Sequence, residues 1–214
     1  MGTLNIAIIP VTAFQQNCAL IWDTESKKGV VVDPGGDAEK IIQAIDETGI
    51  EVEQILLTHG HLDHVGAATA LKNHLGVKIV GPHKDDEFLC SSVAETAKGY
   101  GLGDDFENVK PDTWLNEGDT VEIGGHQFSV LHCPGHAPGH VVFFSEEHRF
   151  AHVGDVLFQG SVGRTDLPGG DHETLINSIK EKLLPLGDDV QFLCGHGPGS
   201  NIGAERENNP FLQN

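Results

Sequence analysis

The sequence predicts an α+β fold: a four-layer αββα sandwich in which two mixed β-sheets face one another and helices cover their outer sides. Two observations lead to this prediction. Strand-like runs and amphipathic helical segments occur in both halves of the chain, which suits two facing sheets better than one parallel sheet. No linker and no tandem repeat divides the 214 residues, which are enough for one domain with a full hydrophobic core. We therefore expect residues 1–214 to form a single domain.

The first half of the chain has the pattern of several strands and two helices. Short β-branched or apolar runs bounded by turn residues predict strands at residues 4–9, 18–22, 29–32, 54–58 and 77–80. We expect the first three to form a meander. Apolar residues at i, i+3, i+4 and i+7 predict an amphipathic helix that begins at Ala38, with Asp37 as its N-cap. A second helix is predicted over residues 64–75 and ends before Gly76.

The second half returns to a β pattern. Strands are predicted at residues 120–123, 127–132, 141–144, 149–153 and 190–194. Gly124-Gly125 marks the turn between the first two of them. A helix is predicted over residues 173–184, because apolar side chains recur there on one face. Residues 84–103 have a weak helical pattern, and the sequence does not place residues 84–118.

The composition limits the partners and the compartment. The chain has 32 acidic and 13 basic residues, a net charge of −19, and such a surface repels nucleic-acid phosphates and anionic lipid head groups. The first residues lack the basic region and long apolar run of a signal peptide, and no stretch approaches the roughly 18 apolar residues of a membrane helix. The four cysteines lack C-x-x-C spacing and are expected to be free thiols. We expect a cytoplasmic protein that binds neither nucleic acid nor membranes; the sequence does not indicate its oligomeric state.

The strongest chemical signal is a histidine-rich loop, Thr58-His59-Gly60-His61-Leu62-Asp63-His64, directly after a predicted strand. In an extended chain residues i and i+2 point to the same side, so His59 and His61 can bind one metal ion. Asp63 and His64, where the chain turns into the helix, can face a neighbouring ion. The alternative is a polar loop with surface histidines, which the later segments disfavour. The spacing therefore predicts a site for two metal ions.

Three later strand ends carry a metal-binding side chain in a glycine-containing turn. These segments are Cys133-Pro134-Gly135-His136, Val153-Gly154-Asp155 and Cys194-Gly195-His196-Gly197. Each is a weak signal alone, because a single histidine after a strand is more often a core or loop residue than a ligand. Glycine lets the backbone approach closely and direct the neighbouring side chain. Together with the histidine-rich loop, the three segments supply a site of seven ligands.

These segments resemble the metallo-β-lactamase superfamily, whose signature H-x-H-x-D-H is followed by a distant His, an Asp and a last His. The match spans essentially the whole sequence. The resemblance implies that one metal ion is bound by His59, His61 and His136. It implies that the second ion is bound by Asp63, His64 and His196, and that Asp155 bridges the two ions.

Within this superfamily the chain resembles the glyoxalase II branch, which hydrolyses thioesters. His136 and Asp155 stand where the true β-lactamases have cysteine. Other segments similar to short glyoxalase II-like proteins are Gly135–His140, Gly154–Phe158, Gly163–Leu167 and Gly195–Ser200. The long glyoxalase II enzymes have a C-terminal helical domain with part of the glutathione site, which this sequence lacks, so glutathione recognition stays open. Arg164 stands where those enzymes have a basic residue that contacts glutathione, so it is a candidate to bind a substrate carboxylate; a loop-stabilising salt bridge is the alternative.

The activity that the resemblance implies is hydrolysis of S-D-lactoylglutathione or a similar small-molecule thioester. A water shared by two divalent cations has a pKa lowered toward about 7 and attacks the thioester carbonyl as hydroxide. The thiol leaves as a thiolate, whose pKa of about 8.5 makes a separate strong acid unnecessary. Asp63 and Asp155 are the candidate catalytic residues, and the resemblance assigns to Asp63 the orientation of the hydroxide or the acceptance of its proton. The imidazole and carboxylate ligands favour two zinc ions, with iron or manganese as alternatives.

Three other functions fit parts of the pattern. A persulfide dioxygenase with one iron shares most of these residues, and a lactonase or another ester hydrolase uses the same chemistry. A binding module that keeps the fold without activity would have lost ligands, whereas all seven are intact here. Nucleases of the same superfamily are disfavoured by the acidic surface.

The remaining histidines have no ligand spacing of their own and are expected to be structural or surface residues. They are His74, His83, His126, His132, His140, His148, His152 and His172. His140 and His152 lie closest to the motifs and are candidates to orient a metal ligand.

Overall fold

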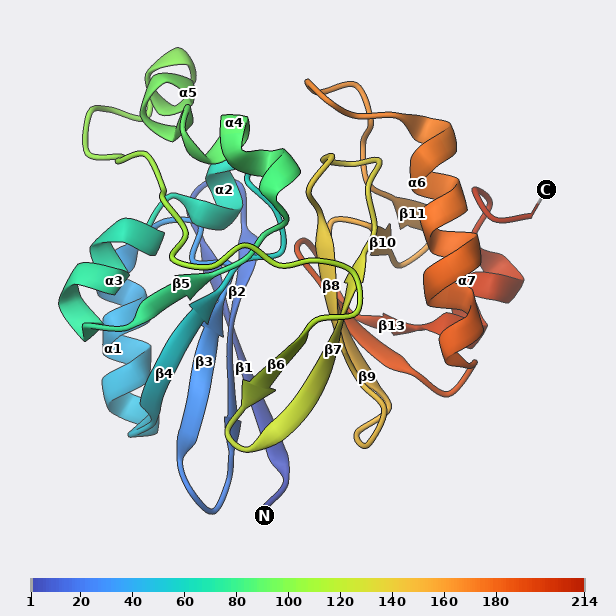
Figure 1. Cartoon of the computed structure of the whole chain (residues 1–214), viewed down its shortest axis with the longest axis horizontal. Helices are drawn as coiled ribbons and strands as arrows, with labels where there is room; N and C mark the ends of the chain where they lie inside the picture. Colours follow the sequence, from blue (N-terminus) through green and yellow to red (C-terminus); the bar gives the residue numbers. More distant parts are fainter. Residues whose placement is uncertain (1, 214) are drawn as a thin grey trace.

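The computed structural model describes residues 2–213 and confirms the four-layer sandwich (Figure 1). The first sheet has five strands in the order β1-β2-β3-β4-β5: β1 (Leu4–Val11), β2 (Gln16–Asp23), β3 (Lys28–Val32), β4 (Glu51–Leu56) and β5 (Lys78–Val80). The second has six strands in the order β13-β12-β9-β8-β7-β6: β6 (Thr120–Ile123), β7 (His126–His132), β8 (Val141–Ser145), β9 (Phe150–Gly154), β12 (Gln191–Cys194) and β13 (Ser200–Asn201). Two short strands, β10 (Leu157–Phe158) and β11 (Ser161–Val162), pair separately.

Both sheets are mixed, as expected. The first three strands form the predicted antiparallel meander, whereas β3, β4 and β5 are parallel. In the second sheet β12 runs parallel to β9, and the other neighbouring strands are antiparallel.

Helices cover the outer faces of the two sheets (Figure 1). The helical segments before β6 are α1 (Ala38–Thr48), α2 (Leu62–Val65), α3 (Ala68–Leu75), η1 (Lys84–Asp86), α4 (Glu87–Cys90) and α5 (Val93–Gly99). Those after β11 are α6 (His172–Ser178), η2 (Ile179–Leu183), η3 (Leu184–Leu186) and α7 (Ile202–Asn208). No described helix combines the length and the apolar composition needed to cross a membrane.

Three hydrophobic cores hold the layers together. Ile41 of α1 and Leu71 of α3 pack on the outer face of the first sheet, and Leu175 of α6 packs on the outer face of the second. A third core fills the space between the sheets, where Ile21 of β2 and Phe143 of β8 are fully buried. All of β2 is buried, and its alternate residues face different cores because successive side chains of a strand point to opposite faces.

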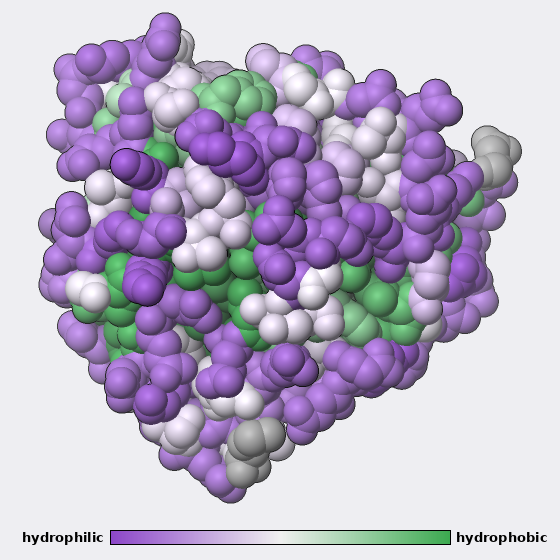
Figure 2. Space-filling view, in the orientation of Figure 1, coloured by the Kyte–Doolittle hydropathy of each residue, from purple (hydrophilic) through white to green (hydrophobic). Residues whose placement is uncertain are grey.

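Hydrophilic side chains cover most of the face shown in Figure 2, and hydrophobic side chains gather toward its middle. The four cysteines are free and buried, as the absence of C-x-x-C spacing predicted.

Several local predictions needed correction. Asp37 occupies the N-cap position of α1, but its side chain caps nothing: its φ is 49° and its carboxylate accepts a hydrogen bond from the backbone N–H of Thr12 (2.8 Å). The helix predicted over residues 173–184 changes from α to π geometry at Ile179. Residues 84–99, which the sequence did not place, form η1, α4 and α5, and β13 and α7 were not predicted.

Candidate metal centre

The seven predicted ligands meet at one edge of the sandwich. Strands β7 and β9 both pair antiparallel with β8 and therefore run in the same direction, and β12 is parallel to β9. Their C-terminal ends consequently lie at the same edge, where they present His136, Asp155 and His196. The end of β4 is held beside them because the backbone N–H of Val141 donates a hydrogen bond to the carbonyl of Thr58 (2.7 Å).

The first group consists of His59, His61 and His136, whose ligand atoms lie within 4.8 Å of one another. Nδ1 of His61 is 2.9 Å from Nε2 of His136. Burial lowers the pKa of all three imidazoles. They are therefore neutral at pH 7, the form of histidine that binds a metal ion.

The second group consists of Asp63, His64 and His196, whose ligand atoms also lie within 4.8 Å of one another. Oδ2 of Asp63 is 3.2 Å from Nε2 of His196 and 3.9 Å from Nε2 of His64. Both Asp63 and His64 belong to the short helix α2, which begins directly after His61. The change from extended chain to helix at this point turns their side chains toward a second position.

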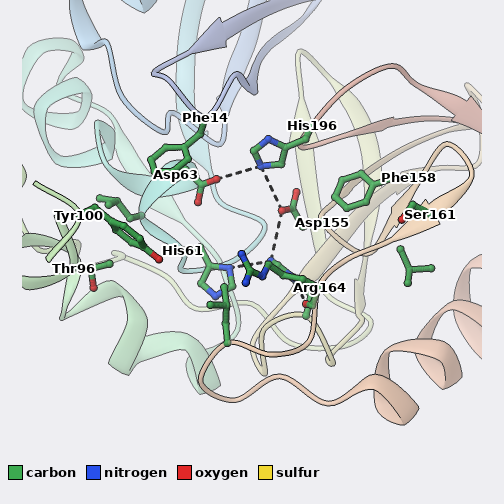
Figure 3. Close-up of a pocket in the computed structure, with 14 residues that line it drawn as sticks. Phe14, His61, Asp63, Thr96, Tyr100, Asp155, Phe158, Ser161, Arg164 and His196 are labelled. Atoms are coloured by element: carbon green, nitrogen blue, oxygen red, sulfur yellow. Dashed lines mark hydrogen bonds and ion pairs between the residues drawn. The ribbon is translucent and has the colours of Figure 1, made fainter. Parts of the chain in front are cut away.

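Asp155 lies between the two groups (Figure 3). Its Oδ1 is 3.4 Å from Nε2 of His64, and its Oδ2 is 3.6 Å from Nε2 of His136 and 3.5 Å from Nε2 of His196. Burial alone would raise the pKa of Asp155, but the neighbouring His64 outweighs that effect and holds the pKa well below its usual range. An ionised carboxylate between two groups of imidazoles suits a ligand shared by two cations.

The donors of these groups fit metal ions and lack other partners. Among the described residues, four buried atoms of the predicted ligands have no hydrogen-bond partner: Nε2 of His59, Nε2 of His61, Nε2 of His64 and Oδ1 of Asp155. An unpartnered buried polar atom is unfavourable, so native proteins rarely leave one without a ligand or an ion. The chain therefore forms a site for two metal ions, in agreement with the metal-binding prediction.

Asp33, which the sequence analysis did not identify, holds one ligand from each group. Its Oδ2 accepts hydrogen bonds from Nδ1 of His64 (2.9 Å) and from the hydroxyl of Thr58 (2.6 Å). Because that hydroxyl donates to Asp33, its oxygen is left to accept from Nδ1 of His59 (3.0 Å). Both imidazoles are thereby fixed with Nε2 directed away from Asp33. Its place directly after strand β3, like the other polar residues at strand ends, was a signal that could have found it.

Two further contacts orient ligands from outside the two groups. Nδ1 of His136 donates a hydrogen bond to the carbonyl of Arg164 (2.8 Å), which leaves Nε2 for a metal. His140 is stacked on His59 with 4.6 Å between ring centroids, and its Nε2 accepts a hydrogen bond from the backbone N–H of Asp155 (3.0 Å). His140 thus contacts one predicted ligand and the backbone of another, so it stays a candidate to orient them. His152 is fully buried, and neither of its ring nitrogens has a hydrogen-bond partner within residues 2–213.

The glycine before His196 is required by close packing. A Cβ at Gly195 would lie 2.1 Å from Oδ1 of Asp155 and 2.5 Å from Cε1 of His64. Any side chain there would displace two of the seven residues. This confirms the prediction that a glycine at this strand end allows close approach of the backbone.

Asp86 joins the two loops that supply the first group. Its buried carboxylate accepts hydrogen bonds from the backbone N–H of Gly60 (2.8 Å) and of Gly139 (2.5 Å). Gly60 lies between His59 and His61, and Gly139 lies three residues after His136. Asp86 was not predicted as a site residue because it falls in a region without a clear periodic pattern.

We expect Asp86→Ala to weaken metal binding by about 10- to 100-fold, the usual effect of removing a group that positions ligands. The substitution leaves two backbone N–H groups without an acceptor and frees the two loops to move apart. Competition with a chelator of known affinity would measure the change. Asp85→Ala is the matched control, because Asp85 is the neighbouring, exposed aspartate; equal affinities of both variants and the wild type would contradict the expectation.

Asp86 also predicts a pH dependence of stability. Burial raises its pKa to about 7, so between pH 4 and 7 the folded chain holds a proton that the unfolded chain has lost. The free energy of unfolding contributed by this group therefore falls as the pH rises, by about 4 kcal/mol in total. Urea unfolding of the chelated protein should show the advantage of wild type over Asp86→Ala shrinking from pH 5 to pH 8. A constant difference would contradict this.

The metal-ligand residues open into a cavity of about 470 Å³ (Figure 3). Its walls include the aromatic side chains of Phe14, Tyr100 and Phe158. Asp155 and His196 both line it, and the side chain of His196 is 31% exposed. A small molecule that enters the cavity therefore meets both groups of ligands.

Arg164 also lines this cavity, as expected of a residue that contacts substrate. Its guanidinium forms two hydrogen bonds with the carboxylate of Asp166, at 2.7 and 2.8 Å, and its side chain is 62% exposed. The structure thus contains the salt bridge within the loop that was the alternative role for Arg164.

Comparison with known proteins identifies the same superfamily as the sequence motifs, over nearly the whole chain. The family model described as the metallo-beta-lactamase superfamily matches residues 11–196. A hydroxyacylglutathione hydrolase, GloC, of Haemophilus influenzae is 54% identical over 210 residues, which cover 98% of both chains. A probable metallo-hydrolase of Bacillus subtilis, YqgX, is 39% identical over 95% of both chains.

Two solved structures are similar over nearly the full length. The BLEG-1 B3 metallo-beta-lactamase has a TM-score of 0.90 and 36% identity, with 98% of this chain and 100% of that one covered. TTHA1623, solved in a di-iron-bound form, has a TM-score of 0.85 and 38% identity, with 96% and 100% covered.

Proposed function

We propose, on the premise that this chain belongs to the metallo-β-lactamase superfamily, that it hydrolyses S-D-lactoylglutathione or a similar thioester. The relative of 54% identity is a hydroxyacylglutathione hydrolase. The observation that carries the proposal is the position of Asp155 between two groups of ligands that open into one cavity. A single domain over residues 1–214 and a cytoplasmic location remain part of the proposal.

The proposed ligand sets are the ones that the sequence analysis assigned. His59, His61 and His136 would hold one divalent ion; Asp63, His64 and His196 would hold the other; and Asp155 would bind both. Zinc suits these imidazole and carboxylate donors, as do iron and manganese. The di-iron-bound form of TTHA1623 supports iron as the first alternative. When bound, two such ions lower the pKa of water toward about 7 and polarise a carbonyl group.

Residues that line the cavity would position the attacking water and limit solvent access during hydrolysis. Attack of water on the thioester carbonyl forms a C–O bond and breaks the C–S bond, so the products are a carboxylic acid and a thiol. Asp63 faces the cavity and is the candidate to orient the attacking water or to accept its proton. The sulfur leaves as a thiolate, because a thiol has a pKa of only about 8.5. The walls formed by Phe14 and Tyr100 would reduce the access of bulk water.

Arg164 would bind a carboxylate of the thiol part of the substrate. We expect Arg164→Ala to raise KM for S-D-lactoylglutathione about three- to tenfold with little change in kcat, since Arg164 is exposed and an exposed ion pair contributes only modestly to binding. The KM of an uncharged thioester should not change. Steady-state kinetics with both substrates would measure this, and an equal rise of both KM values would instead assign Arg164 a role in holding the loop.

The decisive experiment is hydrolysis of S-D-lactoylglutathione measured together with metal content. The proposal expects two metal ions per chain and thioester cleavage that disappears on chelation. One iron per chain with oxygen consumption on glutathione persulfide would favour the dioxygenase instead. Turnover of lactones, esters or a β-lactam without thioester cleavage would overturn the substrate class, and no turnover at all in metal-replete protein would favour a binding module.

A further inference from the structure

A second cluster of possible metal ligands lies at the other end of the sandwich. It contains His126 at the start of β7, and Glu147 and His148 in the turn between β8 and β9; Asp23, at the end of β2, lies beside His126. The metal centre lies near the start of β2 and at the C-terminal ends of β7 and β9, so this cluster is at the opposite edge (Figure 1). The eight residues of β2 separate the two edges by roughly 25 Å.

The buried Asp23 fixes the orientation of His126. Oδ1 of Asp23 accepts hydrogen bonds from the backbone N–H groups of Ser26 (2.7 Å) and Glu25 (3.1 Å). Its Oδ2 lies 3.0 Å from Nε2 of His126. The Ser26 and His126 hydrogen bonds hold the pKa of Asp23 well below its usual range. The carboxylate therefore accepts a hydrogen bond from Nε2 of His126, and Nδ1 is the ring nitrogen that faces away from Asp23.

Two further side chains that can bind a metal ion lie beside Nδ1 of His126. Nδ1 of His126 is 2.9 Å from Nε2 of His148 and 3.7 Å from Oε2 of Glu147. The same carboxylate oxygen is 3.9 Å from Nε2 of His148. The three atoms thus enclose one point, on a side of the ring opposite to Asp23. Arg149 follows His148 in the sequence. The guanidinium of Arg149 pairs with Glu146 and Asp189 and does not neutralise Glu147.

Two imidazole nitrogens and one carboxylate oxygen form a usual set of zinc ligands, and a carboxylate on the other ring nitrogen is the usual support for a zinc-bound histidine. A hydrogen bond between the two imidazoles accounts for the 2.9 Å distance, but not for the carboxylate beside both nitrogens. Glu147 is 60% exposed on the surface and can complete the set with a small side-chain rotation. The fourth position would be open to water.

A comparable cluster shows what such a site must not have. His83, Asp85 and His132 also lie within ligand distance of one another. There, however, Nε2 of His132 donates to the carbonyl of Pro138 (2.8 Å), and Nδ1 of His83 accepts from the backbone N–H of Asp85 (3.2 Å). One ring nitrogen of each of these histidines is thus hydrogen-bonded to the backbone, whereas Nδ1 of His126 and Nε2 of His148 face each other and the carboxylate of Glu147.

We propose that Nδ1 of His126, Nε2 of His148 and Oε2 of Glu147 bind one divalent transition-metal ion, zinc being the probe ion of choice. This ion is additional to the two of the catalytic centre. It does not depend on the proposed thioester hydrolysis. It would tie the turn between β8 and β9 to the start of β7.

The test is the number of zinc ions per chain. Protein stripped with a chelator is dialysed against a small excess of zinc, freed of unbound ions and analysed by elemental analysis and native mass spectrometry. Wild type should hold one zinc ion more than His148→Ala. His74→Ala, which removes an exposed histidine of α3 outside the cluster, should match the wild type. Equal zinc content of wild type and His148→Ala would overturn the proposal.

Two further measurements separate this site from the catalytic centre. Glu147→Gln keeps both imidazoles and should weaken binding of the additional zinc at least tenfold; an unchanged affinity would overturn the three-ligand site. His148→Ala should hydrolyse thioester at the wild-type rate. A loss of hydrolysis in parallel with the zinc ion would place that ion in the catalytic centre and would equally overturn the proposal.

Discussion

Asp155→Ala is expected to lower kcat/KM for S-D-lactoylglutathione on the order of 10³-fold and to reduce the metal content from two ions per chain to one or none. Asp155 has one oxygen 3.4 Å from His64 and the other 3.6 Å from His136. Asp155 thus approaches imidazoles of both groups with its two carboxylate oxygens. Metal-assisted stabilisation contributes several kcal/mol, and each 1.4 kcal/mol corresponds to a factor of ten.

The measurement combines steady-state kinetics with elemental analysis of the purified variant. Asp105→Ala, which changes an exposed aspartate far from the motifs in sequence, should keep both ions and the wild-type rate. If Asp155→Ala retained two ions and its activity, Asp155 would not be a shared ligand and the proposed centre would be wrong.

Asp33→Asn is expected to weaken metal binding about 100-fold and to lower the free energy of unfolding by about 3 kcal/mol. Asp33 receives three donors, namely the backbone N–H and hydroxyl of Thr58 and Nδ1 of His64. The side-chain amide of asparagine has only one acceptor oxygen. Its NH₂ group would face donor groups that the second carboxylate oxygen of Asp33 accepts from in the wild type. The φ of Asp33 is 50°, which asparagine also tolerates, so backbone strain does not add to the effect.

Chelator competition and urea unfolding would measure the two effects of Asp33→Asn. Asp46→Asn, at an exposed position of α1, is the matched control and should change neither quantity. Metal affinity equal to that of the wild type would show that the imidazoles are oriented without Asp33. That outcome would remove the hydrogen-bonded support but leave the ligand assignment in place.

The proposed ligands could be picked out from the sequence because their signals are local. The loop from Thr58 to His64 concentrates three imidazoles and a carboxylate directly after a strand, and the glycine-flanked His136, Asp155 and His196 follow other strands. Most strands and the helix beginning at Ala38 were also predictable, since the periodicity of apolar side chains reflects which face of each element is buried.

The supporting residues could not be predicted in the same way. Asp86 reaches Gly60 and Gly139 across 26 and 53 residues of sequence, and nothing local distinguishes it from the exposed Asp85. His126 and His148 are in contact only because the start of β7 and the turn after β8 lie side by side. The change from α to π geometry after Ser178 was missed because the apolar spacing of that segment suits both forms of helix.

The sequence by itself determined the types of the proposed ligands, the alternation of strands and helices, and the absence of a local disulfide motif. Each of these depends only on the chemistry and spacing of residues that are near one another in the sequence. The tertiary structure decided which carboxylates support which imidazoles, where Asp155 stands between the two groups, and that a second histidine cluster forms at the far edge. The physical reason is that these contacts join residues that are far apart in sequence. Their geometry depends on strand order and on the packing of two sheets, which no short segment encodes.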